Sequence, residues 1–280
     1  MPSVPAAPFK AKLRASILAC LLFAGADGSA LAQCGNGPGG FNAWLQRFRL
    51  QAAAQGIRSG TVLSALSSVS YDPTIIRLDR SQRSFKLSFE QFYARRVNGT
   101  MIRRGRALMQ RHSALLNRIE QRFGVPGAVI VAIWGLETNY GANLGARYSV
   151  IRSLATLAYD CRRTEFFTGQ LLDALRIVEE GDMTAAQLRG GWAGEIGQTQ
   201  FLPTPYIRFA VDFDGDGRKD LIQSVPDVLA STASFLAGHG WKRGDGWQPG
   251  SANYGVIAEW NKADVYDRTI AAMADQLAGH

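Results

Sequence analysis

The sequence predicts a mainly α-helical protein. Apolar residues recur at helical spacing along most of the chain, strand signals are few and short, and glycine-rich turns separate the helical segments. These segments are, in order, Phe41 to Gln55, Thr61 to Leu66, Phe89 to Val97, Met101 to Phe123, Pro126 to Glu137, Val150 to Tyr159, Thr164 to Glu180, Pro203 to Val211, Asp227 to Gly238 and Ala263 to Ala278. No low-complexity linker or internal repeat divides them, so we expect one domain over residues 33–280.

Residues 1–32 predict a signal peptide. Lys10, Lys12 and Arg14 precede a short apolar stretch, and Ala30-Leu31-Ala32 offers a small-residue cleavage site. The apolar stretch is too short to cross a bilayer, and no later segment is long and apolar enough to do so. We therefore expect an exported, periplasmic protein that is soluble once the signal is removed.

The protein stays basic after this processing. The remaining chain has 28 Lys and Arg residues against 22 Asp and Glu residues, a formal charge of +6. A basic exported protein is attracted to anionic polymers such as cell-wall glycan, although a charge of this size is equally typical of a merely soluble protein.

Two cysteines remain after processing, Cys34 and Cys161. Because an exported protein folds in an oxidising compartment, we predict a disulfide bond between them that holds the mature N-terminus against the body of the domain. The alternative is a pair of free, buried thiols.

Glu137 is the strongest candidate for a catalytic residue. It ends the run Val125 to Leu136, which has no other charged side chain and is apolar on every helical face, as in a helix buried all round. Burial disfavours the charged carboxylate and raises its pKa, which suits a general acid. Asn139 or Gly141 can take the left-handed conformation that ends a helix, so Glu137 is expected to face a cleft. The alternative is a surface Glu just past a core helix.

Residues 190–203 form a second candidate site. Glycines are dense there, Trp192 and Phe201 are interleaved with them, and Gln198 and Gln200 add amide groups. Aromatic rings stack on the apolar faces of sugars and amides bind their polar substituents, so a sugar is a fitting ligand. The alternative is a tight turn that packs helices together.

An aspartate-rich segment predicts an EF-hand-like loop. Its candidate ligands are Asp212, Asp214 and Asp216 at positions 1, 3 and 5, the Arg218 carbonyl at position 7 and Asp220 at position 9. Gly217 stands at position 6, but position 12 is Gln223 in place of the usual acid. Asp227 has a competing role as a helix N-terminal cap pair with Ser224. The loop therefore predicts either a weakly bound structural calcium ion or an empty loop.

Taken together, Glu137 to Gly141, Gly194 to Pro203 and Asp212 to Gly217 resemble motifs of the lytic murein transglycosylases of the membrane-bound type B class. Further matches are Leu154 to Asp160 with Arg162 and Arg163, and His239-Gly240-Trp241. The resemblance runs in order from about Phe41 to the C-terminus. It implies a goose-type, lysozyme-like helical core with an added helical arm.

The resemblance also implies the activity. Members of this class cleave the β-1,4 bond between N-acetylmuramic acid and N-acetylglucosamine in peptidoglycan and form 1,6-anhydromuramic ends in place of adding water. Glu137 falls on the class's single catalytic acid/base, and no cofactor is required.

The same resemblance assigns the substrate contacts. It implies that Gln200, Tyr93 and Asn261 contact the sugars, and this chain departs from the class at three further cleft positions. Gly191 stands where a Ser is usual, Phe235 where a Tyr is common, and Trp260 where a Tyr can precede Asn261. We therefore expect the stacking faces to be kept and three hydroxyl partners to be lost.

Glu195 is a second carboxylate near this loop, and we interpret it as a surface charge. Two alternatives stay open. One is a noncatalytic murein-binding or scaffold protein with a degenerate cleft. The other is a muramidase that adds water, with Glu195 or another acid as its base.

Other classes of function find little support. The Arg103 to Arg106 segment is typical of a solvated helix face, so we expect no nucleic-acid partner. His112, His239 and His280 are scattered without ligand spacing, which argues against a catalytic metal. We expect a monomer that acts on peptidoglycan glycan strands.

Overall fold

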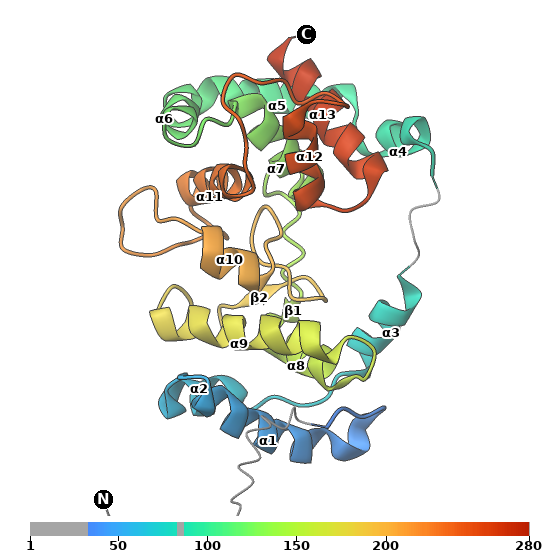
Figure 1. The fold of residues 1–280 in the computed structure, drawn as a ribbon, viewed down its shortest axis with the longest axis vertical. Helices are drawn as coiled ribbons and strands as arrows, with labels where there is room; N and C mark the ends of the chain where they lie inside the picture. The colour runs from blue at the N-terminus through green and yellow to red at the C-terminus, as the bar shows by residue number, and fades with distance from the viewer. Residues whose placement is uncertain (1–32, 83–86, 280) are drawn as a thin grey trace, which may run out of the picture. The chain divides into compact units, whose positions relative to one another are not determined.

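The computed structural model describes residues 33–82 and 87–279, and the predicted signal peptide lies outside them. The described residues are mainly α-helical, as predicted (Figure 1). The helices are α1 (Phe41–Ala54), α2 (Ser59–Leu66), α3 (Pro73–Ser81), α4 (Phe89–Arg96), α5 (Gly99–Arg111), α6 (Ser113–Phe123), α7 (Gly127–Thr138), α8 (Val150–Tyr159), α9 (Thr164–Glu180), α10 (Pro203–Phe209), α11 (Val225–Gly238), α12 (Ala252–Trp260) and α13 (Asp264–Ala278), with a 3-10 turn η1 (Pro38–Gly40). Strands β1 (Tyr148–Ser149) and β2 (Arg189–Gly190) pair antiparallel. Within this part of the chain, no helix has the length and apolar character that crossing a membrane requires.

Three details of the predicted elements were wrong. Helices α3 and α12 were not predicted, although both begin at side-chain caps: Asp72 accepts the amide of Thr74, and Ser251 accepts that of Tyr254. The predicted segment Met101 to Phe123 is two helices, because the chain leaves helical geometry at His112. Short helices of this kind carry too few turns for their apolar spacing to stand out in a sequence.

Helix α7 lies at the centre of the fold. Apart from Glu137, every residue from Gly127 to Thr138 is buried, which confirms the prediction from its apolar run. Helices α5, α6, α11 and α13 all pack against it. Asn139 ends the helix in the left-handed conformation with a φ of 51°, as predicted. Glu137, the only ionisable residue of α7, therefore lies at the C-terminal end of the helix and is its only residue that is not fully buried.

The N-terminal arm, which consists of helices α1, α2 and α3, packs on α8 and α9, which lie side by side (Figure 1). Phe41 and Trp44 of α1 contact the ring of Tyr159 at the end of α8, with ring centroids 5.5 and 5.8 Å apart. The predicted disulfide between Cys34 and Cys161 is present and closes a separation of 127 residues. The arm is thereby held, by aromatic packing and one covalent bond, to the turn between α8 and α9.

Candidate active site

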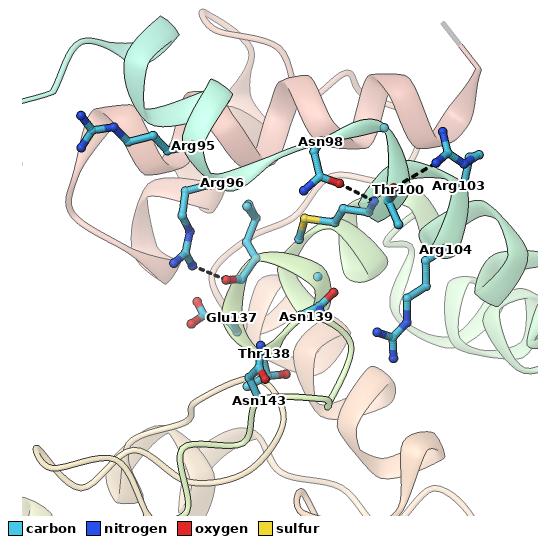
Figure 2. Close-up of a pocket in the computed structure, with 14 residues that line it drawn as sticks. Arg95, Arg96, Asn98, Thr100, Arg103, Arg104, Glu137, Thr138, Asn139 and Asn143 are labelled. Atoms are coloured by element: carbon cyan, nitrogen blue, oxygen red, sulfur yellow. Dashed lines mark hydrogen bonds between the residues drawn. The ribbon is translucent and has the colours of Figure 1, made fainter.

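Glu137 contributes to the walls of two cavities, which therefore meet at its side chain. The first, of about 770 Å³, is lined by the ends of α4, α5 and α7, and we call it the arginine cavity because Arg95, Arg96, Arg103 and Arg104 line it (Figure 2). The second, of about 500 Å³, we call the aromatic cavity because Phe166, Phe167, Trp192, Phe201, Phe235 and Trp260 line it. A groove with an acid at its midpoint suits a polymer that is cut there.

Two neighbours fix the carboxyl group of Glu137. The indole Nε1 of Trp260 and the hydroxyl of Tyr266 both donate to its Oε1, each over 2.9 Å. An oxygen that accepts two hydrogen bonds is poorly suited to carry the proton. The proton of the neutral carboxyl group is therefore expected on Oε2, the oxygen that can face a ligand.

The surroundings also tune the acidity of this group. Burial raises the pKa of Glu137 above its ordinary value, and the nearby Glu195 charge adds to that rise. The hydrogen bonds from Trp260 and Tyr266 and the charge of Arg96 oppose it. A carboxyl group with a raised pKa can hold a proton near neutral pH and release it during a reaction, as an acid/base catalyst must.

The aromatic cavity brings together most of the predicted sugar contacts. Gln200, Phe235, Trp260 and Asn261 all line it. Gln200 donates its side-chain amide to the carbonyl of Gly197 over 2.7 Å, and Asn261 accepts the amide of Ala263 over 3.0 Å. Both amides are thus oriented by the backbone before any ligand arrives.

Trp260 has a role that was not expected. As the sequence indicates, this residue brings no hydroxyl group to the cleft. Its indole N–H nevertheless donates to Glu137, so the position retains a hydrogen-bond donor that points at the candidate acid.

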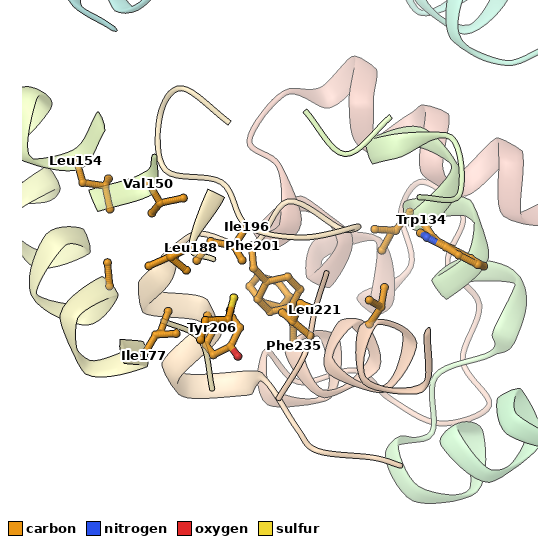
Figure 3. Close-up of a cluster of buried hydrophobic side chains, with 14 of the residues drawn as sticks. Trp134, Val150, Leu154, Ile177, Leu188, Ile196, Phe201, Tyr206, Leu221 and Phe235 are labelled. Carbon is orange, nitrogen blue, oxygen red and sulfur yellow. The ribbon is translucent and has the colours of Figure 1, made fainter. Parts of the chain in front are cut away.

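Gln198 also has a different role from the one expected of it. Its side chain is buried; its Oε1 accepts from Trp134 over 2.8 Å and its Nε2 donates to the Ile222 carbonyl over 2.9 Å. It therefore ties α7 to the glycine-rich loop and is not placed to bind a sugar. Two apolar side chains of the loop, Ile196 and Phe201, belong to the buried cluster that also contains Leu188, Leu221 and Phe235 (Figure 3).

Gly191 and Glu195 form an unexpected pair. A Cβ atom at Gly191 would lie 2.2 Å from Glu195 Oε2, so the space of the missing Ser side chain is filled by this carboxylate. Glu195 is partly buried and lines the aromatic cavity, so our interpretation of it as a surface charge was wrong. Burial raises its pKa, against hydrogen bonds from its own amide and that of Ala193. The cavity is thus lined by three carboxyl groups, those of Glu137, Glu195 and Glu259.

An arginine of the aromatic cavity is held by the N-terminal arm. Arg163 lines the cavity and donates to Asp79 of α3, which also accepts from Arg162 over 2.7 Å. Burial alone would raise the pKa of Asp79, but these two hydrogen bonds outweigh it and hold the pKa below its ordinary value. The arm therefore supplies the counter-charge that orients a cationic side chain at the cleft.

Tyr93 is not brought to either cavity. Its ring packs on Phe89, with centroids 5.6 Å apart, and its hydroxyl is buried without a partner among the described residues. Its predicted contact with sugar stays a prediction.

Two residues that surround Glu137 were missed. Tyr266 lies 129 positions from Glu137 in the sequence, and Arg96 donates to the carbonyl of Leu136. Arg96 is three residues from Tyr93, but only the tyrosine of this segment was predicted to take part in the site.

The aspartate loop lies between α10 and α11. Carboxylate oxygens of Asp212, Asp214 and Asp227 come within 4.8 Å of one another. Asp216 instead accepts the amide of Arg218, and Asp220 accepts those of Ile222 and Gln223. The cluster therefore differs from the predicted ligand set by including Asp227. Ser224 caps α11 by accepting the Asp227 amide, as predicted. Calcium prefers oxygen ligands, so these three carboxylates fit it in kind.

Comparison with known proteins agrees with this geometry. The profile of the family described as transglycosylase SLT domain matches residues 40–252, which contain Glu137, the glycine-rich loop and the aspartate loop. The chain belongs to the transglycosylase SLT domain family.

Two similar proteins have solved structures. SltB3 from Pseudomonas aeruginosa, solved in complex with NAG-anhNAM-pentapeptide and with NAG-NAM-pentapeptide, is 33% identical; in the first complex the match covers 85% of this chain and 80% of that one, with a TM-score of 0.80. The Escherichia coli lytic transglycosylase Slt35 in complex with calcium shares the fold, with a TM-score of 0.74 and 22% identity over 90% of this chain and 97% of that one. These neighbours confirm the predicted lysozyme-like fold.

A curated relative matches over a shorter stretch. Membrane-bound lytic murein transglycosylase B of Escherichia coli (strain K12) is 37% identical over 145 residues. That alignment covers 51% of this chain and 40% of the relative's length.

Proposed function

We propose that this protein is an exported lytic transglycosylase of peptidoglycan. It cleaves the β-1,4 bond between N-acetylmuramic acid and N-acetylglucosamine and leaves 1,6-anhydromuramic ends. The observation that carries the proposal is the position of Glu137, a partly buried acid with a raised pKa where two cavities meet. Family membership and the muropeptide ligands of SltB3 support it.

The hydrogen bonds around Glu137 suggest how the proton moves. With Oε1 occupied by Trp260 and Tyr266, the Oε2 proton passes to the glycosidic oxygen as the bond to the leaving sugar breaks. The muramic O6 hydroxyl then attacks the anomeric carbon and returns its proton to Oε2. One carboxyl group thus serves as acid and then as base, and bond cleavage consumes no water.

The test is digestion of purified sacculi with the protein and with its Glu137→Gln variant. The wild type should release muropeptides with anhydro ends, each lighter by one water than the hydrolysis product, as measured by mass spectrometry. Glu137→Gln keeps the size and the two hydrogen bonds but lacks a transferable proton, so turnover should fall by about 10³-fold or more while the fold is retained. Near-normal activity in this variant would rule out the mechanism.

A second candidate function rests on Glu195. Because this carboxyl group lines the same cavity as Glu137, it can serve as the base that activates a water in a muramidase. Reducing ends in the same digest, lost in Glu195→Gln, would favour hydrolysis. Intact glycan in every sample would favour the binding protein with a degenerate cleft.

Three further features belong to this proposal. We place the mature protein in the periplasm as a monomer that acts on glycan strands. Gly191 and Tyr93 stay assigned to the substrate cleft from the resemblance alone. A structural calcium ion would be held by Asp212, Asp214 and Asp227, with Asp216, the Arg218 carbonyl and Asp220 as further predicted ligands.

A further inference from the structure

The arginine cavity is not explained by the cleavage of a neutral glycan. Four arginines line it, and among its described lining residues the single acid is Glu137. In a strand that carries stems, the lactyl carboxyl group of each muramic acid is amide-bonded to its stem, so the sugars themselves carry no charge. The concentration of positive charge in the cavity therefore points to anionic groups elsewhere on the ligand.

The inner pair of these arginines is available for binding. Figure 2 shows Arg96 and Arg104 reaching from α4 and α5 toward the end of α7, with Arg95 and Arg103 farther out. Arg96 donates one hydrogen bond to the Leu136 carbonyl. Arg104 lies over the Tyr140 ring, 5.5 Å from its centroid, and forms no hydrogen bond within the described residues. Its five N–H donors are therefore free for a planar, bidentate acceptor.

Close packing between α5 and Tyr140 fixes the position of Arg104. The Tyr140 hydroxyl donates to the Met101 carbonyl over 2.9 Å, which joins α5 to the end of α7. Tyr140 has a φ of 59°, and a Cβ at Gly105 would lie 2.5 Å from the Tyr140 hydroxyl, so the close approach of the two elements requires glycine there. The guanidinium is thus carried on a rigid wall.

The remaining polar residues suit a peptide. Asn98, Asn139 and Asn143 line the same cavity. Asn98 Oδ1 accepts the amide of Met101 as the cap of α5, which leaves its amide N–H groups as donors, while Asn139 and Asn143 offer both a donor and an acceptor, as a peptide backbone requires. In peptidoglycan the carboxylates belong to the peptide stems on muramic acid. Because the cavity meets the aromatic cavity at Glu137, its occupant is joined to the sugar being cut.

We propose that the arginine cavity binds the carboxylates of the peptide stem next to the scissile bond, with Arg104 as the principal contact. This inference rests on the proposed function. It gives the two cavities different tasks: the aromatic cavity binds sugar rings, and the arginine cavity selects strands that carry stems.

The test measures binding in a Glu137→Gln background, in which the ligand is not consumed. The two probes are a glycan tetrasaccharide with tetrapeptide stems and the same tetrasaccharide stripped of stems, with its lactyl carboxyl groups capped as methylamides so that it carries no charge. Arg104→Gln should weaken binding of the stem-bearing probe by about tenfold, the effect of one charge-assisted bidentate contact, and leave the stripped probe unaffected. Arg111→Gln, the same change on the same helix outside the cavity, is the matched control and should alter neither.

Each other outcome overturns the inference. Equal weakening for both probes would mean that the cavity binds sugar, and no weakening for either would mean that Arg104 binds no ligand. Displacement of the stem-bearing probe by polyphosphate at lower concentration than by free tetrapeptide would identify a phosphate site. Cleavage of intact sacculi by the wild-type protein tests the proposed function separately, so the two failures are distinguishable.

Discussion

At the scale of single residues, the chemistry depends on how Trp260 and Tyr266 share one oxygen of Glu137. Both donate to Oε1, and both lower a pKa that burial raises. Burial and hydrogen bonding therefore act on the pKa of Glu137 in opposite directions, and removing either donor should raise this pKa.

Trp260→Phe should raise the pKa of Glu137 further, because it removes a hydrogen bond to the charged form while keeping an aromatic ring. If the protonated form starts the reaction, the alkaline limb of the pH profile should move to higher pH. The rate at the optimal pH should fall by about tenfold, because a weaker acid gives up its proton to the glycosidic oxygen less readily. Initial rates on sacculi from pH 5 to 9 measure both effects.

Trp247→Phe is the control for this substitution. Its indole donates over 2.9 Å to Asp275, which lines neither cavity, so its pH profile should match that of the wild type. An unshifted profile in Trp260→Phe would contradict the assigned hydrogen bond.

A second residue links titration to stability. Asp267 of α13 is 3% exposed, its Oδ1 has no partner among the described residues, and burial, with the nearby Asp264 charge, raises its pKa to about 7. The unfolded chain loses this proton near pH 4, so between about pH 4 and 7 the folded state binds more protons and wild-type stability falls as pH rises.

Asp267→Asn removes this pH dependence. The variant should gain stability over the wild type as pH rises through that window, on the order of 2 kcal/mol at pH 8, and little at pH 4. Urea denaturation at several pH values measures the difference. Asp245→Asn, at an exposed position, should follow the wild type at every pH; a constant offset between Asp267→Asn and wild type would exclude the assigned titration.

At the scale of elements, sequence patterns predicted what is local and missed what is distant. The apolar run of α7, its acid and its Asn139 cap are contiguous, so the sequence alone was sufficient to predict them. Tyr266 and Arg96 lie near Glu137 only because α13 packs on α7 and α4 packs on α13, and no sequence spacing predicts these contacts. The burial of Glu195 was not predicted for a similar reason, since its carboxylate fills the space that a side chain at position 191 would take.

The aspartate loop gives an element-scale prediction. Calcium added to metal-free protein should raise the melting temperature. At a calcium concentration one hundred times the dissociation constant, binding should stabilise the folded state by about 2.7 kcal/mol. Replacing both Asp212 and Asp214 by Asn should abolish the rise, because it removes two of the three clustered carboxylates. Calorimetry that detects neither heat nor a shift in melting temperature would show that the loop folds without metal.

At the scale of the whole molecule, one covalent bond holds the N-terminal arm in place. The disulfide joins Cys34 to Cys161, next to the turn that carries Arg162 and Arg163. Asp79 of the arm accepts hydrogen bonds from both arginines, so the arm contacts Arg163, which lines the aromatic cavity. The number of cysteines left after the predicted processing was enough to predict the bond, but its nearness to the cleft was not.

Replacing Cys34 and Cys161 together by Ser should lower the free energy of unfolding by up to about 4 to 5 kcal/mol, because the closed loop is long. Denaturant unfolding with and without reductant measures this loss. Reductant should destabilise the wild type to the level of the double variant and leave that variant unaffected; an equal response in both proteins would mean that the bond does not form.

The filled space at Gly191 has a consequence for how positions 191 and 195 vary among relatives. A side chain at position 191 and the carboxylate at position 195 compete for one volume, because a Cβ atom at Gly191 would lie 2.2 Å from Glu195 Oε2. Homologues that carry Ser at the first position are therefore expected to carry, at the second, a residue that is small or turned away. The constraint acts in one direction: position 195 can shrink while glycine stands at 191, but position 191 can grow only after the carboxylate has given up its place.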